Sequence, residues 1–140
     1  MAYFNDAQEV YDTLGKLFQD LAQDEELAPK FRKADTIVRY EYRDPSSTIT
    51  VRLQEGQPGD VDFGESEMEP EVVMSMEADT AHRFWLGQVN VTVALARGHI
   101  KAKGPVAKIL RLVPLTKPVF PRYRAQLEQQ GRADLMKPPG

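Results

Sequence analysis

Apolar residues near the start of the chain recur with the spacing of one helical face. The apolar positions are Ala7, Val10, Leu14, Leu17, Phe18 and Leu21. Asp6 and Glu9 have the spacing of a capping box, in which each side chain satisfies a backbone N–H of the first turn. The pattern predicts a helix over residues 6–22. A shorter helix is expected to begin at residues 24–28 and to be limited by Pro29 and by Ala34-Asp35.

Alternation of apolar and polar residues predicts strands in the next part of the chain. Residues 37–42 and 49–53 alternate on either side of a turn at 44–47, which is the pattern of a hairpin. Val61 and Phe63 are expected to anchor a short strand after a segment rich in glycine and proline.

A further strand is predicted over 72–76, with Val72, Met74 and Met76 on its inner face. Methionine adapts its shape, so these side chains suit either a cavity wall or ordinary core packing.

Helical spacing returns in the second half of the chain. Asp79 can cap a helix that reaches residue 86, and residues 120–131 form another helical pattern. One apolar stripe predicts a single helix starting near residue 106; its members are Val106, Ile109, Leu110 and Val113.

The segment between these helices contains two glycines. Residues 99–103, between Gly98 and Gly104, alternate like a short strand with one polar face. Residues 89–95 fit two structures: their alternation favours a strand, whereas Asn90 as N-cap and Gly98 as a helix end favour a helix.

Length and composition indicate one globular domain. The chain has 140 residues, 41% hydrophobic and 28% charged. It has no run of about 18 apolar residues and no signal peptide pattern at its start, so we expect a cytoplasmic protein. The absence of cysteine excludes disulfides and thiolate metal sites.

Charge is distributed unevenly along the chain. Residues 1–96 carry a formal charge of −11, and residues 97–140 carry +8. The basic part could meet anionic lipid headgroups, a ligand carboxylate or phosphate, or an acidic partner. Alternatively, it balances the acidic part within one fold. Because the whole chain is acidic and carries no nucleic-acid-binding motif, we expect no nucleic acid partner.

Candidate reacting groups are scarce. His82 and His99 are the only histidines, and neither has a nucleophile or a second histidine at ligand spacing. The serines lie in no nucleophile elbow, and no nucleotide-binding loop is present. The alternating glutamates over 65–71 lack the spacing of a calcium loop. We therefore expect no catalysis, no metal and no cofactor.

The order of small residues and glycines over 87–112 resembles the signature of the sterol carrier protein 2 family. The matching positions are Gly87, Val89-Asn90, Ala94, Gly98-His99-Ile100-Lys101 and Gly104, followed by the apolar helix. In that family the corresponding segment is a helix ending in glycine, a strand, another glycine and a helix near a lipid cavity. The resemblance thus favours a helix over residues 90–97.

The resemblance implies an α+β fold. A single domain over residues 1–133 would contain about five curved, mainly antiparallel strands, covered by about five helices around a hydrophobic tunnel. The last helix would lie over the tunnel mouth, and residues 134–140 would form a flexible tail.

The function implied is non-catalytic binding and transfer or presentation of an apolar lipid: a fatty acid, a fatty acyl-CoA, or a sterol-like or isoprenoid molecule. The expected lining is Met74, Met76, Phe84, Trp85, Val93, Leu95, Ile109, Leu110, Val113, Phe120, Tyr123 and Leu127. Lys101, Arg122 and Arg124 are candidates for contact with a lipid headgroup or an anionic membrane surface. Two alternatives remain open: a scaffold for an enzyme of lipid or quinone biosynthesis, and an interaction module with a filled core. The pattern favours no particular oligomeric state.

Overall fold

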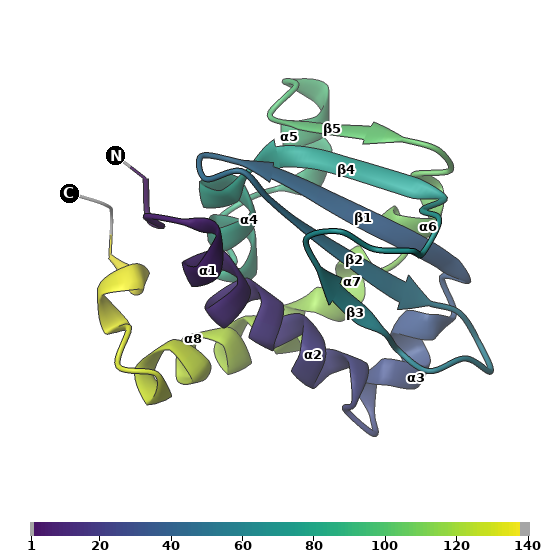
Figure 1. Ribbon diagram of the computed structural model, residues 1–140, viewed down its shortest axis with the longest axis horizontal. Helices are drawn as coiled ribbons and strands as arrows, with labels where there is room; N and C mark the ends of the chain where they lie inside the picture. The colour runs from purple at the N-terminus through teal and green to yellow at the C-terminus, as the bar shows by residue number, and fades with distance from the viewer. Residues whose placement is uncertain (1, 138–140) are drawn as a thin grey trace.

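Five strands form one sheet in the computed structural model, which describes residues 2–137 (Figure 1). The strands are β1 Thr36–Arg43, β2 Ser47–Leu53, β3 Val61–Phe63, β4 Val72–Glu77 and β5 Ile100–Lys103. Their order across the sheet is β3-β2-β1-β4-β5. β1 and β4 are parallel, and the other three neighbouring pairs are antiparallel. The predicted hairpin is β1 and β2, and the α+β fold with a mainly antiparallel sheet is confirmed.

The two faces of the sheet differ in polarity because side chains alternate along each strand. Tyr40 lies opposite Ile49 on one side and Met74 on the other, and Tyr42 lies opposite Met76. These side chains point toward the helices, whereas exposed residues such as Lys101 belong to the other face. The apolar face therefore forms one wall of the hydrophobic core.

Helical segments supply the other walls, and most of them gather on the apolar side of the sheet (Figure 1). They are α1 Ala7–Val10, η1 Tyr11–Gly15, α2 Lys16–Ala22, α3 Leu27–Arg32, α4 Ala78–Trp85, α5 Val91–Ala96, α6 Ala107–Leu110, α7 Val113–Thr116, η2 Lys117–Val119, α8 Phe120–Gln129 and η3 Ala133–Met136. The first three follow one another without a break, which confirms the helix predicted over residues 6–22.

The ambiguous segment is the helix α5. The Asn90 side chain accepts the Val93 N–H at 3.1 Å, and Gly98 follows the helix with a φ of 76°. The cap satisfies an N–H that has no partner inside the helix. The short strand β5 follows α5, as expected.

The single helix predicted from residue 106 onward is wrong. The chain forms two short helices, α6 and α7, with turns at residues 111–112 between them. Pro114 has no N–H to donate to the carbonyl of Leu110, so the helical hydrogen-bond pattern cannot continue there. Pro118 and Pro121 break the next turns in the same way, which is why η2 separates α7 from α8.

Gly104 allows β5 to end close to the start of β4. Its φ is +91°, and a Cβ built on it would lie 2.1 Å from the carbonyl oxygen of Glu71. No other residue type fits that space without moving the backbone. The Glu71 side chain also accepts from Thr36 at 2.7 Å and from Lys108 at 3.0 Å. This glycine therefore fixes where β4, β5 and α6 meet.

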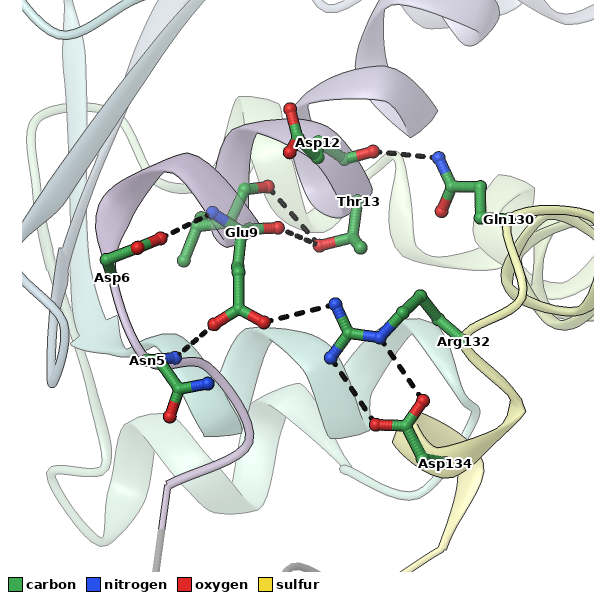
Figure 2. A network of polar contacts seen from close by, with 9 residues as sticks. Asn5, Asp6, Glu9, Asp12, Thr13, Gln130, Arg132 and Asp134 are labelled. Carbon is green, nitrogen blue, oxygen red and sulfur yellow. Dashed lines mark hydrogen bonds and ion pairs between the residues drawn. The ribbon is translucent and has the colours of Figure 1, made fainter.

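Polar contacts join the beginning of the chain to the segment after α8 (Figure 2). Arg132 donates to Glu9 at 3.1 Å and to Asp134 at 3.2 Å. Gln130 donates to the carbonyl of Asp12 at 2.9 Å. Glu9 also accepts the backbone N–H of Asn5. The network holds α1 against the chain after α8.

The flexible tail was predicted to start at residue 134, but residues 133–136 form the short helix η3. Leu135 lies in η3, is 2% exposed, and its carbonyl oxygen is 2.6 Å from His82 Nε2. A buried side chain with a buried hydrogen bond is part of the packed domain, so the boundary lies beyond 133. The last residues of the predicted tail, 138–140, lie outside the described residues.

Candidate binding cavity

A cavity lies between the apolar face of the sheet and the helices that cover it. Strands contribute Tyr40, Tyr42, Val51, Arg52, Leu53, Met74, Met76 and Ile100 to its wall. Helices and loops contribute Phe18, Leu21, Ala22, Ala28, Phe31, Arg32, Gly59, Ala81, Phe84, Trp85, Val91, Ile109, Leu112, Val113 and Thr116. The cavity is thus enclosed by segments from residue 18 to residue 116.

The cavity leaves space that side chains do not fill. The enclosed part measures about 110 Å³, and the space measures about 990 Å³ when the part open to solvent is included. Known ligand pockets are mostly apolar and occupy about 300–1,000 Å³.

Few polar side chains reach the wall, and three of them are already engaged. The Thr116 hydroxyl donates to the Val113 carbonyl at 2.6 Å. Arg32 donates to the Ala22 carbonyl at 3.3 Å, and Arg52 forms an ion pair with Asp60 at 2.8 Å. The Nε atoms of both arginines are enclosed without a partner in the described part of the chain. A mainly apolar wall favours an apolar ligand, because a polar group placed there loses its contacts with water.

The structure brings half of the predicted lining residues together on this wall. The six are Met74, Met76, Phe84, Trp85, Ile109 and Val113. The β4 methionines are buried at 3% and 5% exposure and point inward, as the alternation predicts. Whether they touch a ligand stays a prediction.

The other six predicted residues lie outside the cavity. On α5, Val93 is 43% exposed and Leu95 packs at the edge of the core. Leu110 is half-buried, because the end of α6 turns only Ile109 inward. The expectation that Val93 and Leu110 face the cavity is therefore wrong.

The predicted residues of α8 belong to the packed core or to its edge. Tyr123 and Leu127 are completely buried, and Phe120 packs edge-on against Phe84 at 5.8 Å between ring centres. None of the three lines the cavity.

The three candidate headgroup residues differ in the contacts that they make within the fold. Arg122 pairs with Asp24, and Arg124 donates to the Leu86 carbonyl at 2.6 Å. The contacts of Asp24 with backbone N–H groups and with Arg122 lower the pKa of its carboxyl group. Lys101 is exposed on the polar face of β5. Two of these three cations therefore already have partners within the chain.

Sequence reasoning missed the residues that α2, α3 and β1 contribute. Phe18 lies in the apolar stripe of the first helix, and Tyr40 and Tyr42 alternate on β1, so all three were visible only as core candidates. Periodicity shows which face of an element is buried, but not whether that face meets a packed layer or an open space.

His82 is held by the fold on both ring nitrogens. Nε2 is 2.6 Å from the carbonyl oxygen of Leu135, and Nδ1 is 2.8 Å from the Tyr123 hydroxyl. A carbonyl only accepts, so Nε2 carries the proton and Nδ1 accepts from Tyr123. Burial lowers the pKa of His82, which keeps the ring neutral. Both nitrogens are used, so His82 has a structural role.

Residues 2–137 contain neither a candidate metal site nor a candidate membrane span. No group of three or more histidine, aspartate or glutamate side chains is placed to hold a metal ion there. Among the helices of that range, none is both long and apolar enough to span a bilayer.

Comparison with known proteins identifies relatives with the same architecture. Residues 14–117 match the model of the SCP-2 sterol transfer family. No curated protein sequence is similar enough to count as a match.

Several solved structures are similar to this chain. The apo form of sterol carrier protein 2 from Yarrowia lipolytica has a TM-score of 0.62 and 19% identity, over 85% of this chain and 98% of that one. A ubiquinone synthesis protein, UbiJ-SCP2, has a TM-score of 0.55 and 19% identity, over 76% and 89%. Palmitated SCP2-like 2 from Aedes aegypti has a TM-score of 0.55 and 18% identity, over 77% and 94%. At these identities the structures establish the fold alone.

Proposed function

Because the chain belongs to the SCP-2 sterol transfer family, we propose that it binds one apolar lipid in the cavity between the sheet and α2, α3, α4, α6 and α7. The protein then carries the lipid or presents it to another component, without catalysing a reaction. The family supports lipid binding and transfer in general. The observation that carries the assignment to this cavity is its apolar wall, which encloses about 110 Å³ of space unfilled by side chains.

Burial of an apolar chain can supply the driving force. Each buried CH₂ contributes about 0.8 kcal/mol, so ten methylenes give roughly 8 kcal/mol before the cost of ordering the ligand. Fatty acids, fatty acyl-CoA molecules and sterol-like or isoprenoid lipids all provide such surface. One similar structure is described as palmitated, which supports an acyl chain as one suitable occupant.

The direct test is to extract the purified protein with organic solvent and to analyse the extract by mass spectrometry. We expect a lipid near one molecule per chain, and saturable displacement of a fluorescent fatty acid. No lipid in the extract together with no binding of the fluorescent fatty acid would refute the carrier function and favour an interaction module.

A transient contact with anionic membranes would fit a carrier in the cytoplasm. Val93 is an exposed large hydrophobic side chain on α5, and Lys101 and Lys103 on β5 are exposed cations. Lysines near a surface are attracted to anionic headgroups by about 1 kcal/mol each. Flotation with vesicles should show more bound protein when phosphatidylserine is present; equal binding to neutral vesicles would contradict the proposal.

The second candidate function is a scaffold for a quinone biosynthesis enzyme. It is favoured by the similarity to a protein described as acting in ubiquinone synthesis. Retention of such an enzyme on the purified chain, with no transfer of lipid between vesicles, would support the scaffold over the mobile carrier.

A further inference from the structure

Aromatic rings form a continuous part of the cavity wall. Phe18 of α2 is stacked against Tyr40 of β1 at 5.3 Å between ring centres, and Tyr40 is stacked against Tyr42 at 6.1 Å with only 11° between the planes. Trp85 of α4 meets Phe18 edge-on at 5.7 Å and Phe84 at 5.0 Å. All five line the cavity. Such a wall offers flat faces and edges that pack well against a planar ring.

Two of these rings carry hydroxyl groups that the fold leaves unused. Neither Tyr40 nor Tyr42 has a side-chain hydrogen bond to another described residue. Neither hydroxyl oxygen is fully enclosed by protein atoms, unlike the Nε atoms of Arg32 and Arg52. Tyr123 provides the contrast, because its hydroxyl is used by His82 at 2.8 Å. Each hydroxyl oxygen therefore keeps some accessible surface, and both residues line the cavity.

The surroundings keep both groups as neutral donors. Burial raises the pKa of Tyr40 to about 12 and that of Tyr42 well above its usual value. At neutral pH each phenol thus keeps its proton and can donate one hydrogen bond. A buried carboxylate would need several donors or a paired cation, whereas a carbonyl or hydroxyl oxygen is satisfied by one or two donors.

We propose that Tyr40 and Tyr42 form a subsite for a planar ring that carries a neutral oxygen, either a carbonyl or a hydroxyl group. The proposal rests on the proposed function, since it places the oxygen-bearing end of the apolar ligand in the same cavity. The aromatic wall packs against the ring, and the hydroxyls donate to the oxygen. Ring lipids with a ketone, quinone or alcohol group belong to this class.

A matched pair of probes separates the subsite from the cavity. The probes 1-ethylpyrene and 1-acetylpyrene have the same ring and nearly the same shape, and only the second carries a carbonyl. Trp85 is the chain's only tryptophan and lies on the wall, so energy transfer from it to pyrene reports binding. The measured quantity is the ratio of the two dissociation constants, in the native chain and in Tyr40→Phe, Tyr42→Phe and the double variant.

One neutral hydrogen bond contributes about 1 kcal/mol net, which corresponds to roughly fivefold in affinity. The preference for 1-acetylpyrene should therefore fall about fivefold in each single variant and further in the double variant. Tyr11→Phe is the matched control, because that hydroxyl accepts the Thr48 N–H at 3.3 Å and lies outside the cavity wall. It should leave the ratio unchanged.

The carbonyl itself gives a readout that needs no variant. The infrared stretching frequency of bound 1-acetylpyrene should be lower in the native chain than in an alkane solvent, because a hydrogen bond weakens the C=O bond. A frequency equal to that in alkane would overturn the subsite even if a variant failed to fold.

Other outcomes distinguish the two proposals. Binding of 1-ethylpyrene with a ratio that is the same in all variants would overturn the tyrosine subsite but leave the apolar cavity as a ligand site. Tighter binding of 1-pyrenecarboxylate than of 1-acetylpyrene would also overturn it, in favour of a cationic site at Arg32. Failure of both neutral pyrenes to bind the native chain would overturn the subsite, whereas the proposed function is decided separately by the lipid extract and by binding of the fluorescent fatty acid.

Discussion

Filling the cavity should stabilise the protein and weaken binding at the same time. Ala81 lies on the face of α4 that also carries Phe84 and Trp85, is 4% exposed, and lines the cavity. The substitution Ala81→Leu adds three carbon atoms to that wall. Their burial contributes about 2.4 kcal/mol, and ordering the leucine side chain costs about 0.5–1 kcal/mol. We expect a net gain of roughly 1.5–2 kcal/mol in the free energy of unfolding.

The matched control is the same substitution three residues earlier. Ala78 is on the same helix and completely buried, but it touches no part of the cavity. Ala78→Leu therefore inserts its carbons into packed core and should cost about 1–3 kcal/mol. The two substitutions change the free energy of unfolding in opposite directions only if the space beside Ala81 is open.

Thermal unfolding followed by circular dichroism measures the first effect, and the titration with 1-ethylpyrene measures the second. The gain in stability should raise the melting temperature of Ala81→Leu by about 3–8 °C. Its affinity for 1-ethylpyrene should fall at least about tenfold, which is a loss of roughly 1.4 kcal/mol. Equal destabilisation in both variants would show that the cavity has no room. A stabilised Ala81→Leu with undiminished affinity would place the ligand elsewhere.

Three further predictions concern the fold. Because burial lowers the pKa of His82 from its ordinary value of 6.5, the unfolded chain binds a proton first as the pH falls. The free energy of unfolding, measured by urea titration, should be independent of His82 above about pH 7. Below about pH 6.5 it should decline by at most about 1.4 kcal/mol per pH unit. His82→Gln should remove that decline. Gly104→Ala should cost more than about 3 kcal/mol in urea unfolding, because its Cβ would meet the Glu71 carbonyl oxygen at 2.1 Å. Gly131→Ala, with a φ of +72° but nothing within 4 Å, should cost only about 1–2 kcal/mol; similar losses would contradict the steric explanation. Arg132→Ala should cost only about 0.5–1 kcal/mol, since the ion pair to α1 is partly exposed, and the difference should shrink in high salt.

Local signals in the sequence predict only part of the local structure of this chain. Asn90 and Gly98 bound α5, but the alternation over residues 89–95 favours a strand, and only the family resemblance decides for the helix. The β1 and β2 hairpin follows from alternation and a turn. The break between α6 and α7 was also predictable, since Pro114 removes a specific hydrogen bond, but the apolar stripe alone suggested one helix.

Contacts between distant segments could not be predicted in the same way. The place of Leu135 depends on His82, which lies 53 residues earlier in the chain. The cavity depends on the same kind of information. Phe18 and Tyr40 show the pattern of buried residues, and only the arrangement of α2 against β1 decides that an open space lies beside them.

Packed and open regions lie side by side in this domain. Different residues therefore determine its stability and its binding of a ligand. The residues with 2% exposure or less include Val10, Leu14, His82, Tyr123 and Leu135, and none of them lines the cavity. They join α1, α4, α8 and η3 into one densely packed cluster. Unfilled space forfeits packing contacts, so the open end costs stability that this cluster must offset. Truncating Leu14 should therefore lower stability by about 2–5 kcal/mol without altering the preference between the pyrene probes, whereas changes at the aromatic wall should alter that preference first.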